Sequence, residues 1–327
     1  MISPPAFWSD PDGARHPLAR LLSPLSVIYT RIVAGKIRQV DPVRASIPVI
    51  CAGNITLGGV GKTPFVQLLC QQLTDMGHTP FILMRGYGGT EKGPLRVRIS
   101  HTAQEVGDEA RMHAQSFPVI ISGDRPAGAQ LAAREGASII VMDDGFQNPS
   151  LHKDLAFVLI DGTAGLGNGK VFPAGPLREE PTDAFTRAQA IVMVGETDEH
   201  RSVLPETDLP LLTARITSQI DGELKNQRLH AFSGIGRPEK FFSGLEKAGL
   251  TVPQKTPFAD HHMFSAAEIA RLKAAAAEDD ALLVTTEKDY ARLSADDAAG
   301  IHPIPAHMSV DQPDLLAQFL RSLPEPA

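Results

Sequence analysis

Short runs of apolar residues recur along this chain from residue 47 onward, separated by amphipathic or glycine-rich stretches. Runs without alternating polar positions are typical of strands buried on both faces of a parallel sheet. The stretches between them supply the helices that cover such a sheet. The first half is therefore predicted to be α/β, with strands at residues 47–52, 80–84, 119–122, 138–142, 155–160 and 191–194.

The second half repeats this pattern after an interruption. Residues 196–209 are rich in acidic residues, contain Pro205 and are predicted to form a loop. Further apolar runs then occupy residues 211–216, 229–232, 281–285 and 302–304. We expect a domain boundary near the loop. The expected divisions are a helical segment at 1–40 that belongs to the first domain, the main part of that domain at 41–209, and a smaller C-terminal α/β domain at 210–327.

The segment 13–40 differs because it combines positive charge with helical periodicity. It contains five basic residues and no acidic residue. Arg20 and Arg31 bracket an uncharged run of ten residues, short of the ~20 that a membrane-spanning helix needs. Such a helix either lies on an anionic membrane surface or packs on the protein's own core. Its apolar residues at helical spacing are Leu18, Leu21, Leu22, Leu25, Ile28, Tyr29 and Ile32.

Composition indicates an ordinary globular protein of the cytoplasm. The 327 residues suffice for two domains, and the apolar content of 43% allows each to bury a core. The formal net charge of -7 argues against general nucleic-acid binding, because no overall positive field surrounds the protein. Cys51 and Cys70 lie in apolar surroundings, and the first residues lack a secretion signal, which favours a reducing compartment. No obligate protein partner is predicted.

A glycine-rich loop between a strand and a helix is the strongest chemical signal. The strand at 47–52 runs into the loop 53–63, and an amphipathic stretch follows at 64–73. In a P-loop, backbone N–H groups converge on phosphate oxygens at a helix N-terminus. The lysine reaches the β- and γ-phosphates, and the Ser or Thr hydroxyl binds Mg²⁺. We therefore predict that ATP and Mg²⁺ bind here, through Asn54, Thr56, Gly58, Gly59, Val60, Gly61, Lys62 and Thr63.

One position departs from the usual G-x-x-x-x-G-K-[ST] pattern. The pattern requires glycine at residue 56, where this chain has Thr56. The strand before the loop and the helix after it compensate for this departure. The alternative is a tight glycine turn beside a solvated lysine.

A pair of acidic residues follows another buried strand. The strand at 138–142 ends in Asp143 and Asp144, and a carboxylate at such a strand end can hold Mg²⁺ or its water ligands. The alternative is that one aspartate only caps the Asp-Gly turn before Phe146. Combined with the P-loop, the pair favours a metal site.

A series of short motifs occurs in the order found in one known family. The series resembles the tetraacyldisaccharide 4'-kinase family over nearly the whole chain. The motifs are Gly53-Asn54-Ile55-Thr56 through Lys62-Thr63, Arg85-Gly86-Tyr87-Gly88, Gly107-Asp108-Glu109, Asp143-Asp144-Gly145-Phe146-Gln147, Gly175-Pro176-Leu177-Arg178-Glu179, Gly234-Ile235-Gly236-Arg237-Pro238, Asp260-His261-His262 and Thr285-Thr286-Glu287-Lys288-Asp289.

The resemblance implies a lipid kinase of lipid A biosynthesis. Such an enzyme transfers the γ-phosphate of ATP to the 4'-hydroxyl of an acylated glucosamine disaccharide 1-phosphate, at the cytoplasmic face of the inner membrane. The implied fold is a P-loop NTPase-type, mostly parallel sheet flanked by helices, with a second smaller α/β domain. An acylated substrate does not leave the bilayer easily, because each buried CH₂ contributes about 0.8 kcal/mol. The membrane-surface interpretation of segment 13–40 is therefore favoured.

The resemblance also implies the site residues. Asp108 and His261 would pair to take the proton of the sugar hydroxyl. Because they lie in different halves of the chain, we hypothesise that the pair is completed only when the domains close on substrate. The alternative for Asp108 is a helix cap. The resemblance further implies that Lys62 and Arg125 stabilise charge in the transition state and that Glu179 supports the metal. The residues implied to contact the substrate or the nucleophile are Arg85, Tyr87, Glu109 and Gln147.

These further residues have ordinary structural alternatives. Arg85 and Tyr87 also fit a simple turn, and Arg125 also fits a surface ion pair. The loop itself resembles that of dimerising partition and cell-division ATPases, which are nucleotide switches. Those proteins carry a lysine immediately before the Gly-Gly pair, where this chain has Leu57. A noncatalytic membrane adaptor would leave the P-loop lysine and both aspartates unexplained, so the kinase is favoured.

Overall fold

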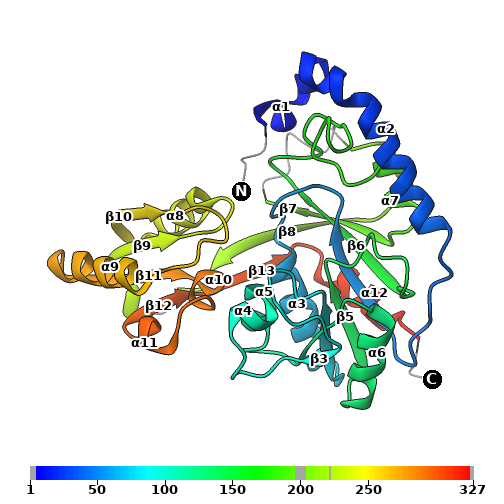
Figure 1. Ribbon diagram of the computed structural model, residues 1–327. Coiled ribbons are helices and arrows are strands. Elements are labelled where there is room, and N and C mark those ends of the chain that lie inside the picture. Colours follow the sequence, from blue (N-terminus) through cyan, green and yellow to red (C-terminus); the bar gives the residue numbers. More distant parts are fainter. Residues whose placement is uncertain (1–4, 196–203, 221, 325–327) are drawn as a thin grey trace.

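The chain forms two sheets, a larger one and a smaller one (Figure 1). The computed structural model describes residues 5–195, 204–220 and 222–324. Within these residues the strands of the larger sheet are β1 (Val49–Asn54), β2 (Pro80–Met84), β3 (Leu95–Arg96), β4 (Val119–Ile121), β5 (Ile139–Asp143), β6 (Leu155–Asp161), β7 (Ala190–Val194), β8 (Leu211–Ser218) and β13 (Ala306–Val310). Their spatial order is β13-β8-β7-β6-β1-β5-β2-β4-β3. The strands from β8 to β4 are parallel, and β13 and β3 add antiparallel edges.

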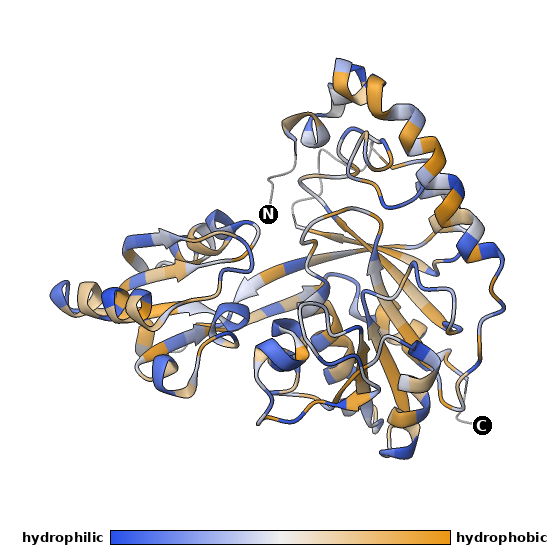
Figure 2. Ribbon diagram, in the orientation of Figure 1, coloured by the Kyte–Doolittle hydropathy of each residue, from blue (hydrophilic) through white to orange (hydrophobic). Residues whose placement is uncertain are grey.

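Helices cover both faces of this sheet, because successive side chains of a strand point to opposite faces. In β1, Ile50 and Ala52 pack in one core with residues of α3, α5 and α12, whereas Val49 and Cys51 pack in a second core with α6 and α7. Figure 2 shows the strands of this sheet as largely hydrophobic, as predicted for strands buried on both faces. The helices are α3 (Lys62–Asp75), α4 (Ala103–Val106), α5 (Asp108–His113), α6 (Arg125–Arg134), α7 (Pro181–Phe185) and α12 (Pro313–Arg321).

The smaller sheet is parallel and also lies between helices. Its strands are β9 (Arg228–Ser233), β10 (Thr251–Pro257), β11 (Ala281–Thr286) and β12 (Ile301–Ile304), in the order β10-β9-β11-β12. The helices of this part are α8 (Pro238–Lys247), α9 (Ala266–Glu278), α10 (Glu287–Tyr290) and α11 (Ala295–Ala298), with a 3₁₀ turn at Gly222–Leu224. One core contains residues of α8, and another contains residues of α9. The predicted α/β fold with a second, smaller α/β part is therefore confirmed.

The chain passes from the larger to the smaller sheet at a different place from the expected domain boundary between residues 209 and 210. The apolar run at 211–216 became β8, which pairs with β7 in the larger sheet. β13 returns to the same sheet by pairing antiparallel with β8. The chain thus leaves the larger sheet after residue 218 and rejoins it at residue 306. Residues 196–203 of the predicted loop lie outside the described residues.

The N-terminal region forms a long helix on the outside of the larger part. It contains α1 (Ala6–Ser9), a 3₁₀ turn (Pro11–Arg15) and α2 (Pro17–Arg38). α2 contacts the protein through Ser26, whose hydroxyl donates to the Val171 carbonyl oxygen at 2.7 Å and accepts from the Ala174 N–H at 3.1 Å. Of the seven predicted apolar residues of α2, Leu22 and Tyr29 are half-buried, and Tyr29 packs against the second core. The other five form an exposed stripe in which each is more than half exposed: Leu18, Leu21, Leu25, Ile28 and Ile32. The core-packing alternative is therefore wrong for this stripe, which is visible along α2 in Figure 2.

The length of α2 also corrects one step of the sequence argument. Its 22 residues and mean hydropathy meet the requirements for a membrane-spanning helix, by length and composition alone. The uncharged run between Arg20 and Arg31 is too short to span by itself, and the prediction that the helix cannot cross a membrane rests on that run alone. A spanning window tolerates a few charged residues, so that exclusion does not hold.

Candidate active site

The glycine loop joins the carboxyl end of β1 to the start of α3, as the strand-loop-helix pattern predicted. Gly61 precedes the helix with a φ of +84°, a left-handed conformation that glycine adopts without strain. Within the described chain, no hydrogen bond uses the backbone N–H groups of residues 58–63. N–H groups grouped in this way at a helix N-terminus can bind an anion such as a triphosphate.

Side chains of the predicted site hold this loop through hydrogen bonds. Lys62 Nζ lies 3.1 Å from Asn54 Oδ1, and the Asn54 amide donates to the Thr56 carbonyl oxygen at 2.6 Å. Lys62 Nζ also lies 3.5 Å from Asp144 Oδ1, and the Lys62 side chain is only 14% exposed. The alternative of a solvated lysine is therefore wrong. Thr63 follows in the first turn of α3 and is half-buried.

Asp144 occupies a left-handed turn directly after β5, with a φ of +52°. Arg178 donates to its Oδ1 at 2.9 Å. Partial burial raises the pKa of Asp144, but the charges of Lys62 and Arg178 outweigh it, so the pKa lies below its ordinary value. The carboxylate is ionised at neutral pH, and its described contacts are with these two cations rather than with a turn.

Asp143, the last residue of β5, is buried and has one oxygen without a partner. Its Oδ2 lies 3.1 Å from Nε2 of His113, the last residue of α5. Its Oδ1 meets no donor among the described residues, an arrangement that is costly unless a cation or donor binds there. Asp143 Oδ1 and the Thr63 hydroxyl are suitable oxygen ligands for Mg²⁺. Sites of this ion often use one or two carboxylates together with substrate phosphates.

A site built only from protein ligands is not found. The described ranges contain no group of three or more His, Cys, Asp or Glu side chains placed to hold a metal ion. The oxygens around the P-loop therefore fit an ion that is bound together with nucleotide phosphates.

Glu179 and Gln147 form a buried support behind the P-loop. The Gln147 amide donates to the Asn54 carbonyl oxygen at 2.8 Å and to Glu179 Oε1 at 3.0 Å. Glu179 Oε2 forms an ion pair with Arg187. Each oxygen of Glu179 thus has a protein donor, and Gln147 connects Glu179 to the loop. The predicted contact of Gln147 with substrate has no counterpart among these bonds.

Arg85, Tyr87 and Arg125 surround the same end of the sheet. Arg85 and Tyr87 are exposed in the loop after β2. A Cβ at Gly107 would lie 2.4 Å from the Tyr87 carbonyl oxygen, so this loop packs directly beside Asp108. Arg125 is buried, which contradicts a surface ion pair. Burial and the charge of Arg85 lower the pKa of Arg125, and its Nε has no partner in the described part of the chain.

Asp108 and His261 meet between the two parts of the fold. Asp108 begins α5, and His261 lies in the loop between β10 and α9 with a φ of +58°. His261 Nδ1 is 3.0 Å from Asp108 Oδ2. The cap position of α5 is Gly107, and no side chain caps it, so the alternative that Asp108 is only a helix cap is wrong. The contact joins the two halves of the chain, and the hypothesis that the domains close on substrate to complete the pair stays a prediction.

The pKa of Asp108 reflects its neighbours. Burial alone raises the pKa of this carboxyl group. The hydrogen bonds from His261 and Arg292 and the positive charges of Lys288 and Arg292 outweigh burial, and the pKa lies well below its ordinary range. Asp108 is therefore an ionised carboxylate at neutral pH.

Other charged contacts join the two parts of the fold. Glu109, predicted to bind substrate, pairs with Lys288 at 3.0 Å. Asp161, at the end of β6, accepts from Arg237 at 2.8 Å and from Lys240 at 2.9 Å. The small sheet is thus attached along the carboxyl ends of the large sheet's strands, where ligands bind in open α/β sheets.

Several residues of this region were not predicted from the sequence. Arg178 lay inside a quoted motif but received no role, although an arginine next to Glu179 after a Gly-Pro turn was a usable signal. His113 and Arg292 gave no signal, because nothing local indicates that either side chain is buried beside a carboxylate.

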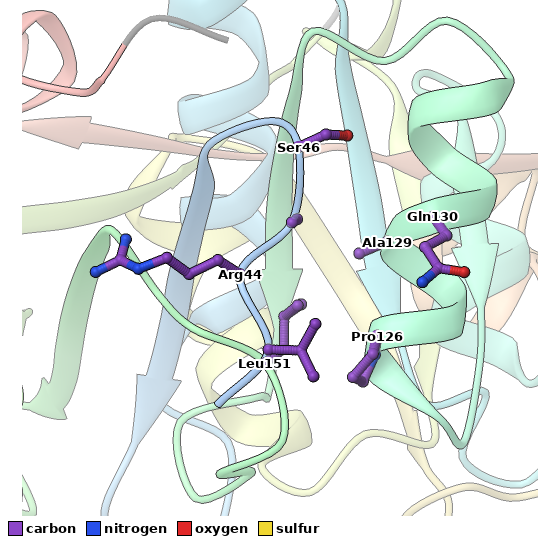
Figure 3. A pocket seen from close by; sticks show the side chains of 8 residues that line it. Arg44, Ser46, Pro126, Ala129, Gln130 and Leu151 are labelled. Atoms are coloured by element: carbon purple, nitrogen blue, oxygen red, sulfur yellow. The ribbon is translucent and has the colours of Figure 1, made fainter. Parts of the chain in front are cut away.

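Figure 3 shows a pocket whose lining contains none of the predicted site residues. It has a volume of about 250 Å³ and is lined by the segment before β1, by α6 and by Leu151. None of its lining residues belongs to the P-loop or to the Asp108–His261 pair.

A glycine loop of this form on a parallel sheet, with Lys62, Thr63 and strand-end carboxylates around it, defines a P-loop nucleotide-binding protein. The chain matches the family model described as Tetraacyldisaccharide-1-P 4'-kinase over residues 18–324, and it belongs to this family.

Individual relatives agree with this assignment. The chain is 45% identical over 323 residues to the tetraacyldisaccharide 4'-kinase of Rhodospirillum centenum, covering 98% of this chain and 96% of that protein. It is 47% identical over 294 residues to the enzyme of the same name from Gluconobacter oxydans, covering 89% and 88%. A crystal structure of the "apo" form of LpxK from Aquifex aeolicus in complex with ATP superposes with a TM-score of 0.77 at 27% identity, covering 93% of this chain and 98% of that one.

The recognition from the motifs is thus confirmed. The protein is an ATP-using kinase of the tetraacyldisaccharide 4'-kinase family, with a lipid A disaccharide as its substrate class. The partition-type ATPase switch is not favoured.

Proposed function

We propose that this protein transfers the γ-phosphate of ATP to the 4'-hydroxyl of tetraacyldisaccharide 1-phosphate at the cytoplasmic face of the inner membrane. The observation that supports this best is the placement of two groups on one short helix. α5 begins with Asp108, which contacts His261, and ends with His113, which contacts Asp143. Five residues of helix span about 7.5 Å along the axis. α5 thus links the two groups, because it carries Asp108 of the acceptor-activating pair and contacts the metal carboxylate Asp143 through His113.

The P-loop binds and orients the nucleotide in this proposal. The N–H groups of residues 58–63 and the Lys62 ammonium group hold the β- and γ-phosphates. Thr63, Asp143 and Asp144 hold Mg²⁺, which neutralises charge on the phosphates when bound. Arg125, with Arg85 beside it, adds positive charge near the transferring group.

The Asp108–His261 pair takes the proton of the 4'-hydroxyl. Because Asp108 is ionised, it accepts a hydrogen bond from Nδ1–H of His261 and holds this tautomer of the ring. Nε2 is then the ring nitrogen with a free lone pair, and it receives the proton. Asp108 stabilises the imidazolium ion that forms.

Residues 219–305 form the smaller domain in this proposal, and residues before and after them form the kinase domain. The ion pairs of Asp161 and Glu109 with residues of the small sheet support it, because they lie between these two parts. The small domain therefore delivers His261 to a site that the large domain builds.

The exposed helix α2 lies on the membrane surface. Its contact with residues 171–174 through Ser26 holds one side of the helix against the protein, so it cannot cross a bilayer without leaving that contact. Its apolar stripe faces away from the protein, and its basic residues suit anionic headgroups. The acylated substrate remains in the bilayer while its sugar reaches the site. The proposal involves no nucleic acid and no obligate protein partner.

The test is incubation of the protein with γ-labelled ATP, Mg²⁺ and the disaccharide 1-phosphate lipid in detergent. Label should appear at the 4' position. Asp108→Asn should lower kcat by about 10²- to 10⁴-fold, the contribution of a general base, while ATP binding persists. Label released only as free phosphate, with the lipid present, would contradict the proposed acceptor.

A further inference from the structure

Arg292 is a buried arginine just after α10 whose guanidinium group lies between two carboxylates. Its side chain is 1% exposed. Nε and Nη2 donate to Asp108 Oδ2 at 3.0 and 2.6 Å. Nη1 donates to Asp289 Oδ1 at 2.7 Å and to the Gly234 carbonyl oxygen at 2.9 Å. Every guanidinium nitrogen thus has a partner, as a buried arginine requires.

Arg292 contacts both members of the Asp108–His261 pair, and it also holds the backbone of His261 through a shared carbonyl oxygen. The Gly234 carbonyl oxygen that accepts from Arg292 also accepts from the His261 N–H at 3.0 Å. Asp289 holds the same turn from the other side, because its Oδ2 accepts from the Gly234 N–H at 3.1 Å. The positions of Asp108 and His261 are therefore set by one side chain.

The charge of Arg292 also constrains the proton on His261. Nη2 of Arg292 lies 3.4 Å from His261 Nδ1. Arginine has donors only, and the ionised Asp108 has acceptors only. Asp108 Oδ2, fixed by two bonds from Arg292, lies 3.0 Å from Nδ1 and is the acceptor that this nitrogen needs. Nδ1 is therefore the ring nitrogen that donates to Asp108.

We infer that Arg292 is a positioning residue for phosphoryl transfer, which fixes the carboxylate of Asp108 and the tautomer of His261 from within the small sheet's part of the fold. This inference rests on the proposed role of the Asp108–His261 pair. Lysine cannot substitute, because a single ammonium group lacks the planar fork that reaches Asp108, Asp289 and the Gly234 carbonyl oxygen together.

The experiment compares Arg292→Ala and Arg292→Lys with a matched control. Arg111→Met is suitable, because Arg111 of α5 donates to the Ala291 and Leu293 carbonyl oxygens across the same interface but, within the described residues, has no side-chain hydrogen bond or ion pair with Asp108. A side-chain displacement of about 1 Å can lower a rate about 100-fold, and we expect a loss of that order in kcat for Arg292→Ala. The KM for ATP should stay near the wild-type value, since the P-loop is untouched. Arg111→Met should retain kcat.

Two further readouts separate positioning from a merely structural ion pair. Ethylguanidinium ion in the assay should restore part of the kcat of Arg292→Ala, whereas ethylammonium ion should not. ¹⁵N NMR of the imidazole ring should show the Nδ1–H tautomer of His261 in the wild type and a mixture of tautomers in Arg292→Lys. If Arg292→Ala does not fold, Arg292→Lys and the NMR measurement decide.

The outcomes distinguish this inference from the proposal on which it rests. Wild-type kcat and an unchanged His261 tautomer in Arg292→Lys would overturn the inference, as would an equal loss of kcat in Arg111→Met. If Asp108→Asn retains wild-type kcat, the role of the pair itself is wrong. If Asp108→Asn is inactive while Arg292→Lys is fully active, only the inference about Arg292 is wrong.

Discussion

The apolar stripe of α2 gives a prediction whose size can be worked from the structure. Leu21 lies in the middle of the stripe and is 72% exposed. Fully burying a leucine contributes about 1.5 to 3 kcal/mol, so insertion of the exposed part contributes about 1 to 2 kcal/mol. Leu21→Gln should therefore weaken membrane binding by about 5- to 30-fold.

This loss should be visible because the whole stripe is a modest anchor. The five stripe residues together expose the equivalent of about three leucine side chains, which corresponds to about 4 to 8 kcal/mol on full insertion. That is comparable with one myristoyl chain, whose membrane binding is marginal and reversible. Each stripe residue is therefore a substantial fraction of the anchor.

Val27 supplies a matched control on the same helix. It is 50% exposed and lies about 120° around the helix from Leu21, at 3.6 residues per turn. Flotation with phosphatidylethanolamine and phosphatidylglycerol vesicles measures the partition of each variant. Leu21→Gln should float less, and Val27→Gln should float like the wild type. Equal effects of the two substitutions, or no effect of either, would refute the stripe as the contact surface.

Two further predictions concern stability. Gly53→Ala places a Cβ 2.3 Å from the Cβ of the buried Phe146, and overpacking of this kind should lower the free energy of unfolding by about 1 to 3 kcal/mol, measured by urea denaturation. Burial raises the pKa of Asp161, but the positive charges of Lys240 and Arg237 outweigh burial, so folding lowers this pKa. The ionised carboxylate therefore stabilises the fold above the unfolded pKa of about 3.9. This stabilisation disappears as the pH falls through the folded pKa. The Asp161→Asn variant should therefore melt at a lower temperature than the wild type at pH ~7, and this difference in melting temperature should shrink below pH ~4. Thermal melts across this pH range measure it. A difference that does not depend on pH would contradict the ion pairs.

The strands of the fold could be predicted because most are apolar throughout. Every predicted apolar run lies within or overlaps an observed strand, from β1 to β12. The strands missed were β3, β10 and β13, which are short or largely exposed and therefore lack a continuous apolar run. The assignment of β8 to the larger sheet was missed as well, because pairing partners are not encoded in a strand's own hydrophobicity.

The sequence by itself determined the class of chemistry. The P-loop and the paired aspartates after β5 are local patterns, and their spacing along the chain positions backbone N–H groups, a lysine and carboxylates by strand and helix geometry alone. The apolar stripe of α2 could likewise be predicted, because its residues recur with the period of an α-helix.

Only the tertiary structure decided which residues support these groups. His113 meets Asp143 across 30 residues of chain, and Arg292 meets Asp108 across 184. Charge and hydrogen bonding act through space and depend on burial, whereas local sequence reports only periodicity and turn preference. Arg292 could not be predicted because its role depends on its buried position between two carboxylates, and only the packing of the two sheets creates that position.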